Sequence, residues 1–488
     1  MARSRNTFDS LDPRTGEIYD TFPLHSEEDV YTAVTVAHDA AHRWSALGFS
    51  GRKKVLLRYS DLLMDQIEEL AQIVATETGK PLSDAKLEIT IAAHHVAWVA
   101  RHAAEILRTS HRPAGALMAN MSARVEHVPM GVVGVIGPWN YPVFTPMGSI
   151  AYALGAGNTV VFKPSEYTPG VGVALADLFV HAAGASDIFQ VVTGLGATGA
   201  ALCTSGVNKV AFTGSTATAK KVAALCAKNL TPLIAECGGK DPVIVARDAD
   251  IAAAVDATLW SAMANAGQSC IGAERVYVEE PIADIFTEKL LYRASQIHAG
   301  EEYGPATMPS QIKIIAAHIK AAQKDGGVAA LGGDFSVKEP YVQPVVLLDV
   351  PEDSDAMVDE TFGPTLVINR VPDMATAIRL SNASRYGLGA SVWSRRQGNR
   401  IASQLQCGMV AINSAFTFAA VASIPFGGIK DSGYGRIHGP EGLTEFTYAR
   451  SIVKARFQLP LKIVSFQRTP SVDRIVVRLA KLLRGRLS

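Results

Sequence analysis

The sequence predicts an α/β protein whose mostly parallel sheets are covered by helices on both faces. Short apolar runs alternate with helical stretches from residue 131 to residue 239, which is the order that parallel strands and crossover helices require. A second series of the same kind begins near residue 241 and runs to about residue 416. The chain has 488 residues, too many for one hydrophobic core, so we expect two or three domains.

The individual elements follow this alternation in order. Before the first series, we expect helices at residues 29–47, 51–80 and 82–107 and a strand at residues 120–130. The predicted strands of the first series are residues 131–139, 159–164, 187–194, 207–214 and 231–239. The helices between them are residues 148–157, 170–184 and 217–228. This is a doubly wound, Rossmann-like layout, which binds its ligand outside the carboxyl ends of the strands.

Composition and charge favour an ordinary globular protein. Apolar residues make up 48% of the chain and the formal net charge is zero, so no overall field attracts nucleic acid. The five cysteines lack the spacing of a disulfide framework or of a metal site, which favours a reducing compartment and predicts no bound metal. No signal peptide and no run of about 18 apolar residues is found, so we expect a cytoplasmic location.

Two glycine-rich turns follow predicted strands. The segment GLGATG places Gly194, Gly196 and Gly199 in a GxGxxG spacing, which alone is weak evidence for a nucleotide site. The segment FTGST, residues 212–216, precedes a predicted helix whose N-terminus could hold a phosphate. On local evidence, a purely structural turn and a phosphate site remain equally open.

Two other short segments contain reactive or charged side chains. In FKPSE, residues 162–166, Lys163 could donate to ribose hydroxyls and Glu166 could accept from them, although a solvated turn explains both residues equally simply. In NAGQSCIGAER, residues 265–275, Cys270 lies among small residues. Taken alone, a buried and inert cysteine is the simpler interpretation.

Seven motifs in a fixed order change these interpretations. They are GPWNYP, KPSE, FTGST, ECGGK, GQSC, ETFGP and PFGGIKDSGYGR. Together they resemble the aldehyde dehydrogenase superfamily over residues 5–455. The resemblance implies that Cys270 is the catalytic thiol, that Asn140 and the Cys270 N–H form the oxyanion hole, and that Glu236 activates water. Because branches that transfer the acyl group to coenzyme A lack this glutamate, it also implies hydrolysis to a free acid.

The resemblance further implies a nicotinamide dinucleotide cofactor. Lys163 and Glu166 would hold the adenosine ribose. Lys163 is also expected among the catalytic residues. Because Glu166 would repel a 2′-phosphate, NAD is expected rather than NADP. The implied cofactor-binding residues are Pro138, Trp139, Lys163, Ser165, Glu166, Gly196, Gly199, Phe212, Gly214, Ser215, Glu360 and Phe362. Two positions depart from the family pattern, because Cys237 replaces an apolar residue and Ala219 replaces a glycine.

The same resemblance implies a three-part organisation and a homodimer or homotetramer. The expected parts are an NAD-binding domain (1–108 and 131–237), a catalytic domain (238–435) and a small β element for oligomerisation (109–130 and 446–458). Residues 459–488 then form a C-terminal extension beyond the usual family length.

The expected substrate is a hydrophobic aldehyde, aliphatic or aromatic. The substrate-entry loop, residues 413–426, has no charged side chain and contributes Phe416 and Phe426, and Phe144 adds to the same pocket. Enzymes for succinate semialdehyde often have an arginine where this chain has Ala264. A semialdehyde or amino-aldehyde dehydrogenase, and a non-catalytic protein that reuses the fold, remain the alternatives.

The C-terminal extension has the pattern of a basic amphipathic helix over residues 471–486. Residues 456–488 contain eight basic residues and one acid, so this segment has a net charge of +7. Val472, Ile475, Val476 and Leu479 share one helix face, and Ser471 is the expected N-cap. The helix could pack on the protein body or on a dimer partner, lie on an anionic membrane surface or be disordered, and a packed helix could also gate the substrate tunnel.

Overall fold

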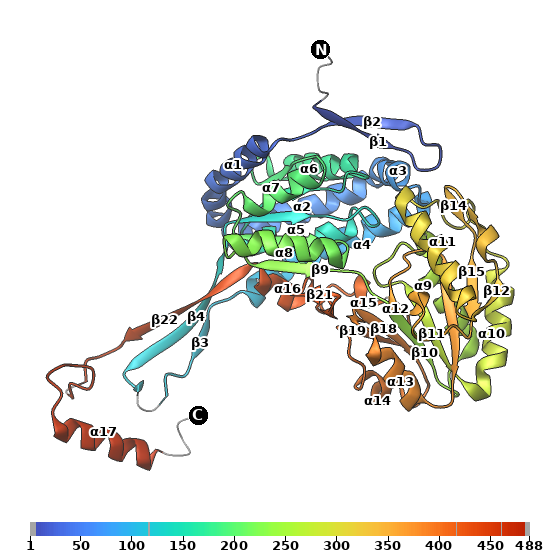
Figure 1. The fold of residues 1–488 in the computed structure, drawn as a ribbon. Coiled ribbons are helices and arrows are strands. Elements are labelled where there is room, and N and C mark those ends of the chain that lie inside the picture. The colour runs from blue at the N-terminus through green and yellow to red at the C-terminus, as the bar shows by residue number, and fades with distance from the viewer. Residues whose placement is uncertain (1–5, 116–117, 416, 460, 484–488) are drawn as a thin grey trace.

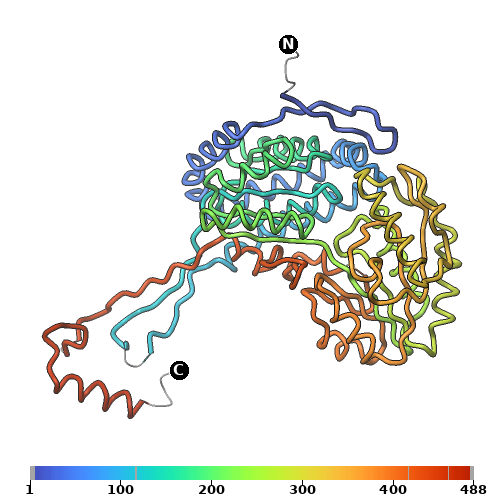
Figure 2. Tube along the Cα trace, viewed as in Figure 1, coloured from blue at the N-terminus to red at the C-terminus, as the bar shows by residue number. Residues whose placement is uncertain are grey.

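The computed structural model describes residues 6–115, 118–415, 417–459 and 461–483. Figure 1 shows two α/β bodies side by side and a thin arm that leaves the first body with the C-terminal helix at its end. The tube in Figure 2 follows the chain from the first body into the second and back to the arm. This arrangement confirms the predicted α/β class with parallel sheets.

The first body is built on a six-stranded sheet with the order β21-β9-β8-β5-β6-β7. Strands β5 to β9 are parallel, and β21 joins β9 in the antiparallel direction. The strand bounds are β5 Val132–Ile136, β6 Thr159–Lys163, β7 Phe189–Val191, β8 Lys209–Thr213, β9 Leu233–Glu236 and β21 Gly433–Tyr434. The sheet therefore combines the first predicted series with a strand from near the end of the chain.

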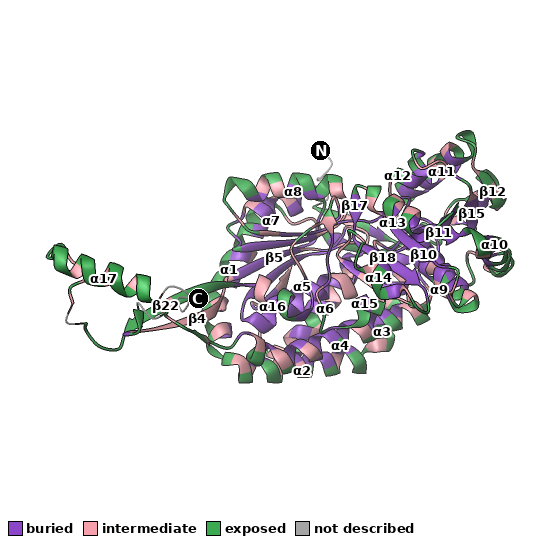
Figure 3. Cartoon of the chain, turned by 90° about the horizontal axis from the view of Figure 1, so that it is seen from below, coloured by how far each residue is buried: buried purple, intermediate pink, exposed green. Residues whose placement is uncertain are grey.

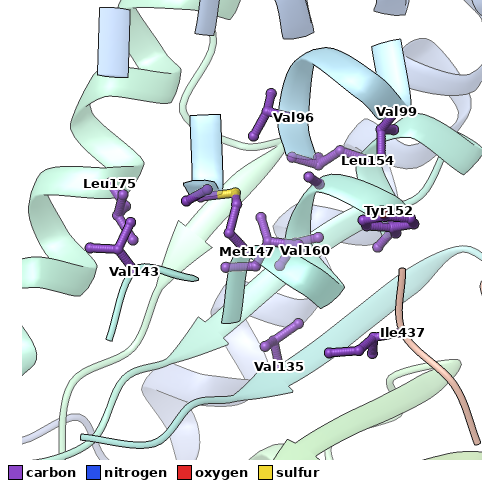
Figure 4. Packing of buried hydrophobic residues seen from close by; sticks show 14 of the residues in the cluster. Val96, Val99, Val135, Val143, Met147, Tyr152, Leu154, Val160, Leu175 and Ile437 are labelled. Atoms are coloured by element: carbon purple, nitrogen blue, oxygen red, sulfur yellow. The ribbon is translucent and has the colours of Figure 1, made fainter. Parts of the chain in front are cut away.

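Helices cover both faces of this sheet because the strand residues alternate between two cores. Val133, Val135, Val160 and Phe162 pack in one cluster, whereas Val132, Val161 and Val210 belong to another. The first cluster is closed by α2 Gly48–Asp65, α3 Ile67–Thr78, α4 Leu82–Ile106, α5 Phe144–Ala156 and α6 Pro169–Ala183. The second is closed by α1 Glu27–Ala46, α7 Gly196–Thr204 and α8 Thr216–Lys228. Figure 4 shows part of the first cluster, with Met147 and Leu154 of α5 among its labelled residues.

The second body contains a seven-stranded sheet with the order β12-β15-β16-β11-β10-β18-β19. All neighbours are parallel except β12 and β15. The bounds are β10 Asp241–Val245, β11 Ala273–Glu279, β12 Val328–Leu331, β15 Val345–Leu348, β16 Thr365–Val371, β18 Gly389–Trp393 and β19 Met409–Ile412. Its larger helices are α9 Ile251–Met263, α10 Glu280–Ala294, α11 Pro309–Lys324 and α13 Met374–Ala383.

Several short elements complete the two bodies. The chain begins with a hairpin of β1 Thr7–Leu11 and β2 Ile18–Pro23. Two small antiparallel pairs are β13 Val337–Lys338 with β14 Tyr341–Val342, and β17 Tyr386–Gly387 with β20 Ile429–Lys430. The remaining short helices are α12 Asp355–Val358, α14 Gly398–Ala402, α15 Thr417–Ala420 and α16 Gly439–Glu445.

The arm is a three-stranded antiparallel sheet with the order β22-β4-β3. It joins β22 Thr447–Ala455 to β4 Met121–Pro129, and β4 to β3 Ser110–Arg112. No residue of β4 is fully buried, and Figure 3 shows the arm in the colours of exposed and half-buried residues. Within the described chain, neither face of this sheet is covered by a second layer, and the edge strands β22 and β3 have unpaired backbone groups.

The C-terminal helix α17, Pro470–Leu482, lies at the far end of the arm and has no buried residue. The predicted N-cap at Ser471 is wrong, because the helix begins at Pro470 and Thr469 is the N-cap. Proline suits the first helical position, where its missing N–H has no intrahelical partner. Among the described residues, no helix is long and apolar enough to cross a membrane.

Other element boundaries also differ from the sequence prediction. The single helix predicted at residues 51–80 is two helices, α2 and α3, separated at Gln66, whose φ of −100° departs from helical geometry. The strand predicted at residues 131–139 ends at Ile136, and α5 begins earlier than predicted, at Phe144. The intervening segment, residues 137–143, is therefore a loop at the carboxyl end of β5.

Candidate active site

A cleft of about 730 Å³ lies at the carboxyl ends of β5, β6 and β8. All residues that the sequence analysis assigned to cofactor binding line it, and so do Asn140 and Cys270. The predicted cofactor-binding residues that line the cleft are Pro138, Trp139, Lys163, Ser165, Glu166, Gly196, Gly199, Phe212, Gly214, Ser215, Glu360 and Phe362. This position is where a doubly wound sheet binds its ligand.

The N-terminus of α8 faces this cleft and fits an anionic group. Ser215 is its N-cap, and the Ser215 hydroxyl accepts from the Thr218 N–H at 3.3 Å. A Cβ at Gly214 would lie 2.7 Å from the ring of Phe212, so glycine is required for this tight turn. The first N–H groups of the helix and its dipole favour a phosphate. The GxGxxG segment instead forms the start of α7, where Gly199 lines the same cleft.

Lys163 and Glu166 form a polar pair at the edge of the cleft. The Lys163 side chain is buried, and its Nζ lies 3.3 Å from Oε2 of Glu166, whose side chain is 39% exposed. Burial lowers the pKa of Lys163, and the nearby Glu166 carboxylate partly offsets this effect. An ammonium donor beside a carboxylate acceptor matches the hydroxyls of a ribose.

Cys270 lies where the cleft meets a second cavity of about 230 Å³. The two cavities share Cys270, Cys237, Thr145 and Thr213. The second cavity has mostly apolar walls, formed by Leu87, Ile91, Phe144, Trp260, Ala264, Ile271, Phe426 and Ile437 among others. The predicted pocket residues Phe144 and Phe426 line it, whereas Phe416 lies outside the described residues. A thiol at this junction can contact one molecule bound in the cleft and another bound in the second cavity.

The thiol of Cys270 is protonated at neutral pH in the free protein. Burial raises the pKa of Cys270 well above its usual value, and the carboxyl groups of Glu360, Asp241 and Glu236 raise it further. Burial also raises the pKa of the neighbouring thiol of Cys237, to about 12. Neither group is an activated thiolate without a change in its surroundings.

The Asn140 side chain is fixed near Cys270 by the loop that precedes the cysteine. Its Nδ2 donates to the Gln268 carbonyl at 2.9 Å, which leaves the second amide hydrogen for an oxygen held beside the thiol. Asn265, Ala266 and Gly267 all have φ between 53° and 70°, a rare left-handed run. A Cβ at Gly267 would lie 2.1 Å from the Gly363 carbonyl, so the loop packs directly on the backbone after Phe362.

Glu236 is the last residue of β9 and extends into the second cavity. It is 3% exposed, and neither carboxyl oxygen has a hydrogen-bond partner among the described residues. Burial raises the pKa of Glu236 well above its usual value, and only Arg436 opposes this shift appreciably. A Cβ at Gly427 would lie 2.7 Å from Oε1 of Glu236, so this glycine makes room for the carboxyl group. Glu236 is therefore suited to bind and release a proton near Cys270.

Glu360 approaches Cys270 from the cofactor side of the junction. It accepts from the Gly239 N–H at 3.0 Å, and burial raises its pKa to about 8. A Cβ at Gly238 would lie 2.2 Å from its carboxyl oxygens. These contacts place the carboxyl group of Glu360 directly against the turn that follows Glu236.

The sequence analysis missed the residues that hold the Glu360–Phe362 segment. Glu274 accepts from the N–H groups of Thr361 at 2.8 Å and of Phe362 at 2.9 Å. It is also paired with the buried Lys240. Lys240 is the last residue of the ECGGK motif, so the motif could have indicated its importance. Glu274 belongs to none of the seven motifs, so nothing in the sequence indicated its role.

Comparison with known proteins identifies the family. An aldehyde dehydrogenase family model matches residues 1–452. The chain is 37% identical over 464 residues to 4,4′-diapolycopene aldehyde oxidase of Methylomonas sp, covering 93% of this chain and 87% of that protein. It is 35% identical over 453 residues to a putative succinate-semialdehyde dehydrogenase [NADP(+)] of Mycolicibacterium smegmatis (strain ATCC 700084 / mc(2)155), covering 91% and 87%.

A solved structure agrees with these matches. The crystal structure of a putative aldehyde dehydrogenase from Burkholderia cenocepacia superposes with a TM-score of 0.90 at 31% identity, covering 95% of this chain and 96% of that one. The resemblance drawn from the seven motifs is thereby confirmed, and so are the fold class and the oxidation of an aldehyde with a nicotinamide dinucleotide. The chain belongs to the aldehyde dehydrogenase family.

Proposed function

We propose that this enzyme oxidises a hydrophobic aldehyde, aliphatic or aromatic, to the carboxylic acid with NAD. The observation that carries the proposal is the apolar second cavity that ends at Cys270. Such a cavity binds an alkyl or aryl chain by removing its surface from water. The name of the Methylomonas relative, an aldehyde oxidase for the apolar compound 4,4′-diapolycopene, agrees with this substrate class.

The one cationic side chain among the described residues lining this cavity is not available as a carboxylate anchor. Lys80 Nζ donates to Oε2 of Glu88 at 2.7 Å and to the Asn140 carbonyl at 2.8 Å, and it lies 4.3 Å from the centre of the Tyr141 ring. Its side chain is fully buried. A substrate carboxylate in this cavity would therefore lose its hydrating water without gaining a cationic partner. This supports a neutral aldehyde over succinate semialdehyde.

Succinate semialdehyde is the second candidate substrate, and the comparison with the Mycolicibacterium relative favours it. That protein is named for this substrate, although its name also marks the function as putative. The Ala264 side chain in the wall of the cavity argues against it, because no charge is placed there. An amino-aldehyde would need a carboxylate partner, and Asp84 in this wall could supply one, whereas Glu88 is already paired with Lys80.

The side chains at the junction suit the two stages of the reaction. The Cys270 sulfur would add to the aldehyde carbon to give a thiohemiacetal. Because its raised pKa keeps the free thiol protonated, the thiol must lose this proton for the addition to occur. The Asn140 amide and the Cys270 N–H would stabilise the oxyanion. Bound NAD would accept the hydride that leaves this carbon. Glu236, whose pKa is raised by burial, would then take a proton from the water that hydrolyses the thioester.

The preference for NAD rests on Glu166. Lys163 and Glu166 would hold the adenosine ribose, Ser215 and the first turn of α8 the pyrophosphate, and Glu360 the nicotinamide ribose. A carboxylate at Glu166 would repel a 2′-phosphate. The Mycolicibacterium relative is named for NADP(+), so the cofactor of this chain needs its own measurement.

We also propose a location and partners for this enzyme. The uncovered sheet of β3, β4 and β22 would pair with the same sheet of another copy, giving a homodimer or homotetramer. All five cysteines are unpaired, in keeping with a cytoplasmic location. The basic amphipathic segment 471–486, of which residues 471–483 are described, would contact an anionic membrane surface.

The first prediction concerns substrate choice. With NAD, we expect kcat/KM from NADH formation to be highest for decanal or benzaldehyde, and lower for acetaldehyde and succinate semialdehyde. The methyl ester of succinate semialdehyde is a neutral substrate of matched length, and we expect it to exceed the acid by about tenfold because no cation receives the carboxylate. A higher kcat/KM for the acid would contradict the hydrophobic-aldehyde proposal. No oxidation of any aldehyde would contradict the proposed function itself.

The second prediction concerns the cofactor. Wild-type enzyme should use NAD with a kcat/KM at least about tenfold above that for NADP, and Glu166→Gln should reduce this ratio by removing the repulsive charge. Glu105→Gln is the matched control, because Glu105 is exposed and does not line the cleft. An unchanged ratio in Glu166→Gln, or a wild-type preference for NADP, would show that Glu166 does not set the choice.

The third prediction concerns the C-terminal segment. The full chain should float with vesicles that contain phosphatidylserine but not with pure phosphatidylcholine vesicles, and truncation after Gln458 should abolish flotation. Each basic residue near such a surface contributes about 1 kcal/mol, so added salt should also release the protein. The membrane proposal fails if both lengths float equally or neither floats. A lower Tm of the truncated chain would instead indicate that α17 packs on protein.

A further inference from the structure

Two buried charged residues hold the loop that contains Asn140. Lys80 lies one residue before Pro81, the N-cap of α4, and Glu88 lies in the second turn of this helix. Their side chains form an ion pair of 2.7 Å and are 0% and 1% exposed. Both residues lie more than fifty positions from Asn140 in the sequence, so no local pattern links them to the oxyanion segment. Burying an ion pair costs free energy, and the hydrogen bonds that these two side chains make with the oxyanion segment offset this cost.

Glu88 binds the end of the segment where α5 begins. Its Oε1 accepts from the Val143 N–H at 2.8 Å and from the Phe144 N–H at 3.1 Å. The first N–H groups of a helix lack intrahelical partners, and α5 has no side-chain cap of its own. Glu88 supplies the missing acceptor from another helix, and its charge also suits the positive end of the α5 dipole.

Lys80 binds the other end of the segment. Its Nζ donates to the Asn140 carbonyl at 2.8 Å as well as to Glu88, while the ring of Tyr141 covers it at 4.3 Å. Position 79 must be glycine for this placement, because Gly79 has a φ of 78° and a Cβ there would lie 2.6 Å from Pro305. Lys80 therefore directly follows a tight turn at Gly79, and this turn fixes the position of the lysine side chain.

The peptide of Asn140 is thus bound from two sides. Asn265 Nδ2 also donates to the Asn140 carbonyl, at 3.0 Å, and to the Gln268 carbonyl, at 3.2 Å. The same Gln268 carbonyl accepts from the Asn140 side chain at 2.9 Å. Lys80 and the cysteine loop consequently determine together how the Asn140 amide is directed at Cys270. A shift of this amide of about 1 Å can lower a rate by about 10²-fold.

We propose that Lys80 and Glu88 are positioning residues of the oxyanion hole, which act through the backbone of residues 140–144. The proposal rests on the proposed function, in which the Asn140 amide stabilises the thiohemiacetal oxyanion. Neither charge takes part in the chemistry itself. Their loss should affect the formation of the thiohemiacetal and leave the binding of the dinucleotide intact, because neither residue lines the cofactor cleft.

A double-mutant cycle tests the proposal. In Lys80→Met/Glu88→Gln, which leaves no buried charge unpaired, we expect kcat/KM for decanal to fall about 10²-fold. Asn140→Ala alone should cost about 10²- to 10³-fold. If the pair acts through Asn140, the combined variant should be no slower than Asn140→Ala. The Kd of NADH, measured by its fluorescence, should not change in any of these variants.

Lys86→Met is the matched control. Lys86 lies on the same helix and pairs with Glu68 at 2.7 Å, but this pair is partly exposed and remote from the oxyanion segment. It should retain wild-type kcat/KM. A merely structural role for Lys80 and Glu88 would instead appear as losses that multiply with that of Asn140→Ala, or as weaker NADH binding, and either result would overturn the proposal.

A crystal structure of Lys80→Met/Glu88→Gln gives a readout that does not depend on turnover. We expect the Asn140 carbonyl to rotate away from its present direction and the Asn140 amide to leave the Gln268 carbonyl. An unmoved Asn140 would overturn the positioning role, even for an enzyme that oxidises aldehydes as proposed. Conversely, an inactive wild-type enzyme with a displaced Asn140 in the variant would refute the proposed function, and with it the oxyanion hole, and would leave only the finding that the pair fixes the Asn140 peptide.

Discussion

The site depends on a turn of four residues between the two sheets. Strand β9 ends at Glu236 and β10 begins at Asp241, so the chain crosses from one body to the other within this distance. Side chains cannot be accommodated in the middle of the turn. A Cβ at Gly238 would meet the Glu360 carboxyl oxygens at 2.2 Å, and a Cβ at Gly239 would lie 2.8 Å from the Cys270 carbonyl. These two glycines let groups from both sheets approach the same small volume.

The close approach has an electrostatic consequence. Glu236 and Asp241 are buried near the thiol and Glu360 is half-buried there, and burial raises the pKa of each carboxyl group, to about 7 for Asp241 and about 8 for Glu360. These groups in turn raise the pKa of Cys270. The free enzyme therefore keeps the proposed nucleophile, Cys270, as an unreactive thiol, and positive charge or a proton acceptor brought to the site by its ligands would favour the thiolate. The apolar side chains of the second cavity supply substrate binding next to this cluster of carboxyl groups.

Sequence reasoning found the parts of the site that lie within short motifs. The alternation of strands and helices predicted both sheets, and the order of seven motifs predicted which side chains line the cofactor cleft. It missed Lys80, Glu88 and Glu274, because each acts on a loop that is distant in sequence and nothing in its neighbours indicates the contact. It also missed the left-handed run at Asn265 and Ala266, since neither residue type requires positive φ. The amphipathic pattern predicted the helix α17 but does not specify what its apolar face contacts, and no residue of α17 is buried against the described chain.

In the proposed reaction, Cys270 carries the acyl group until Glu236 enables its hydrolysis. Intact-mass analysis of Glu236→Gln mixed with NAD and decanal tests this step directly. A decanoyl thioester should accumulate on Cys270 and be absent when Cys270 is replaced by alanine in the same background. No adduct despite NADH formation, or an acyl group on Cys237 instead, would contradict this step.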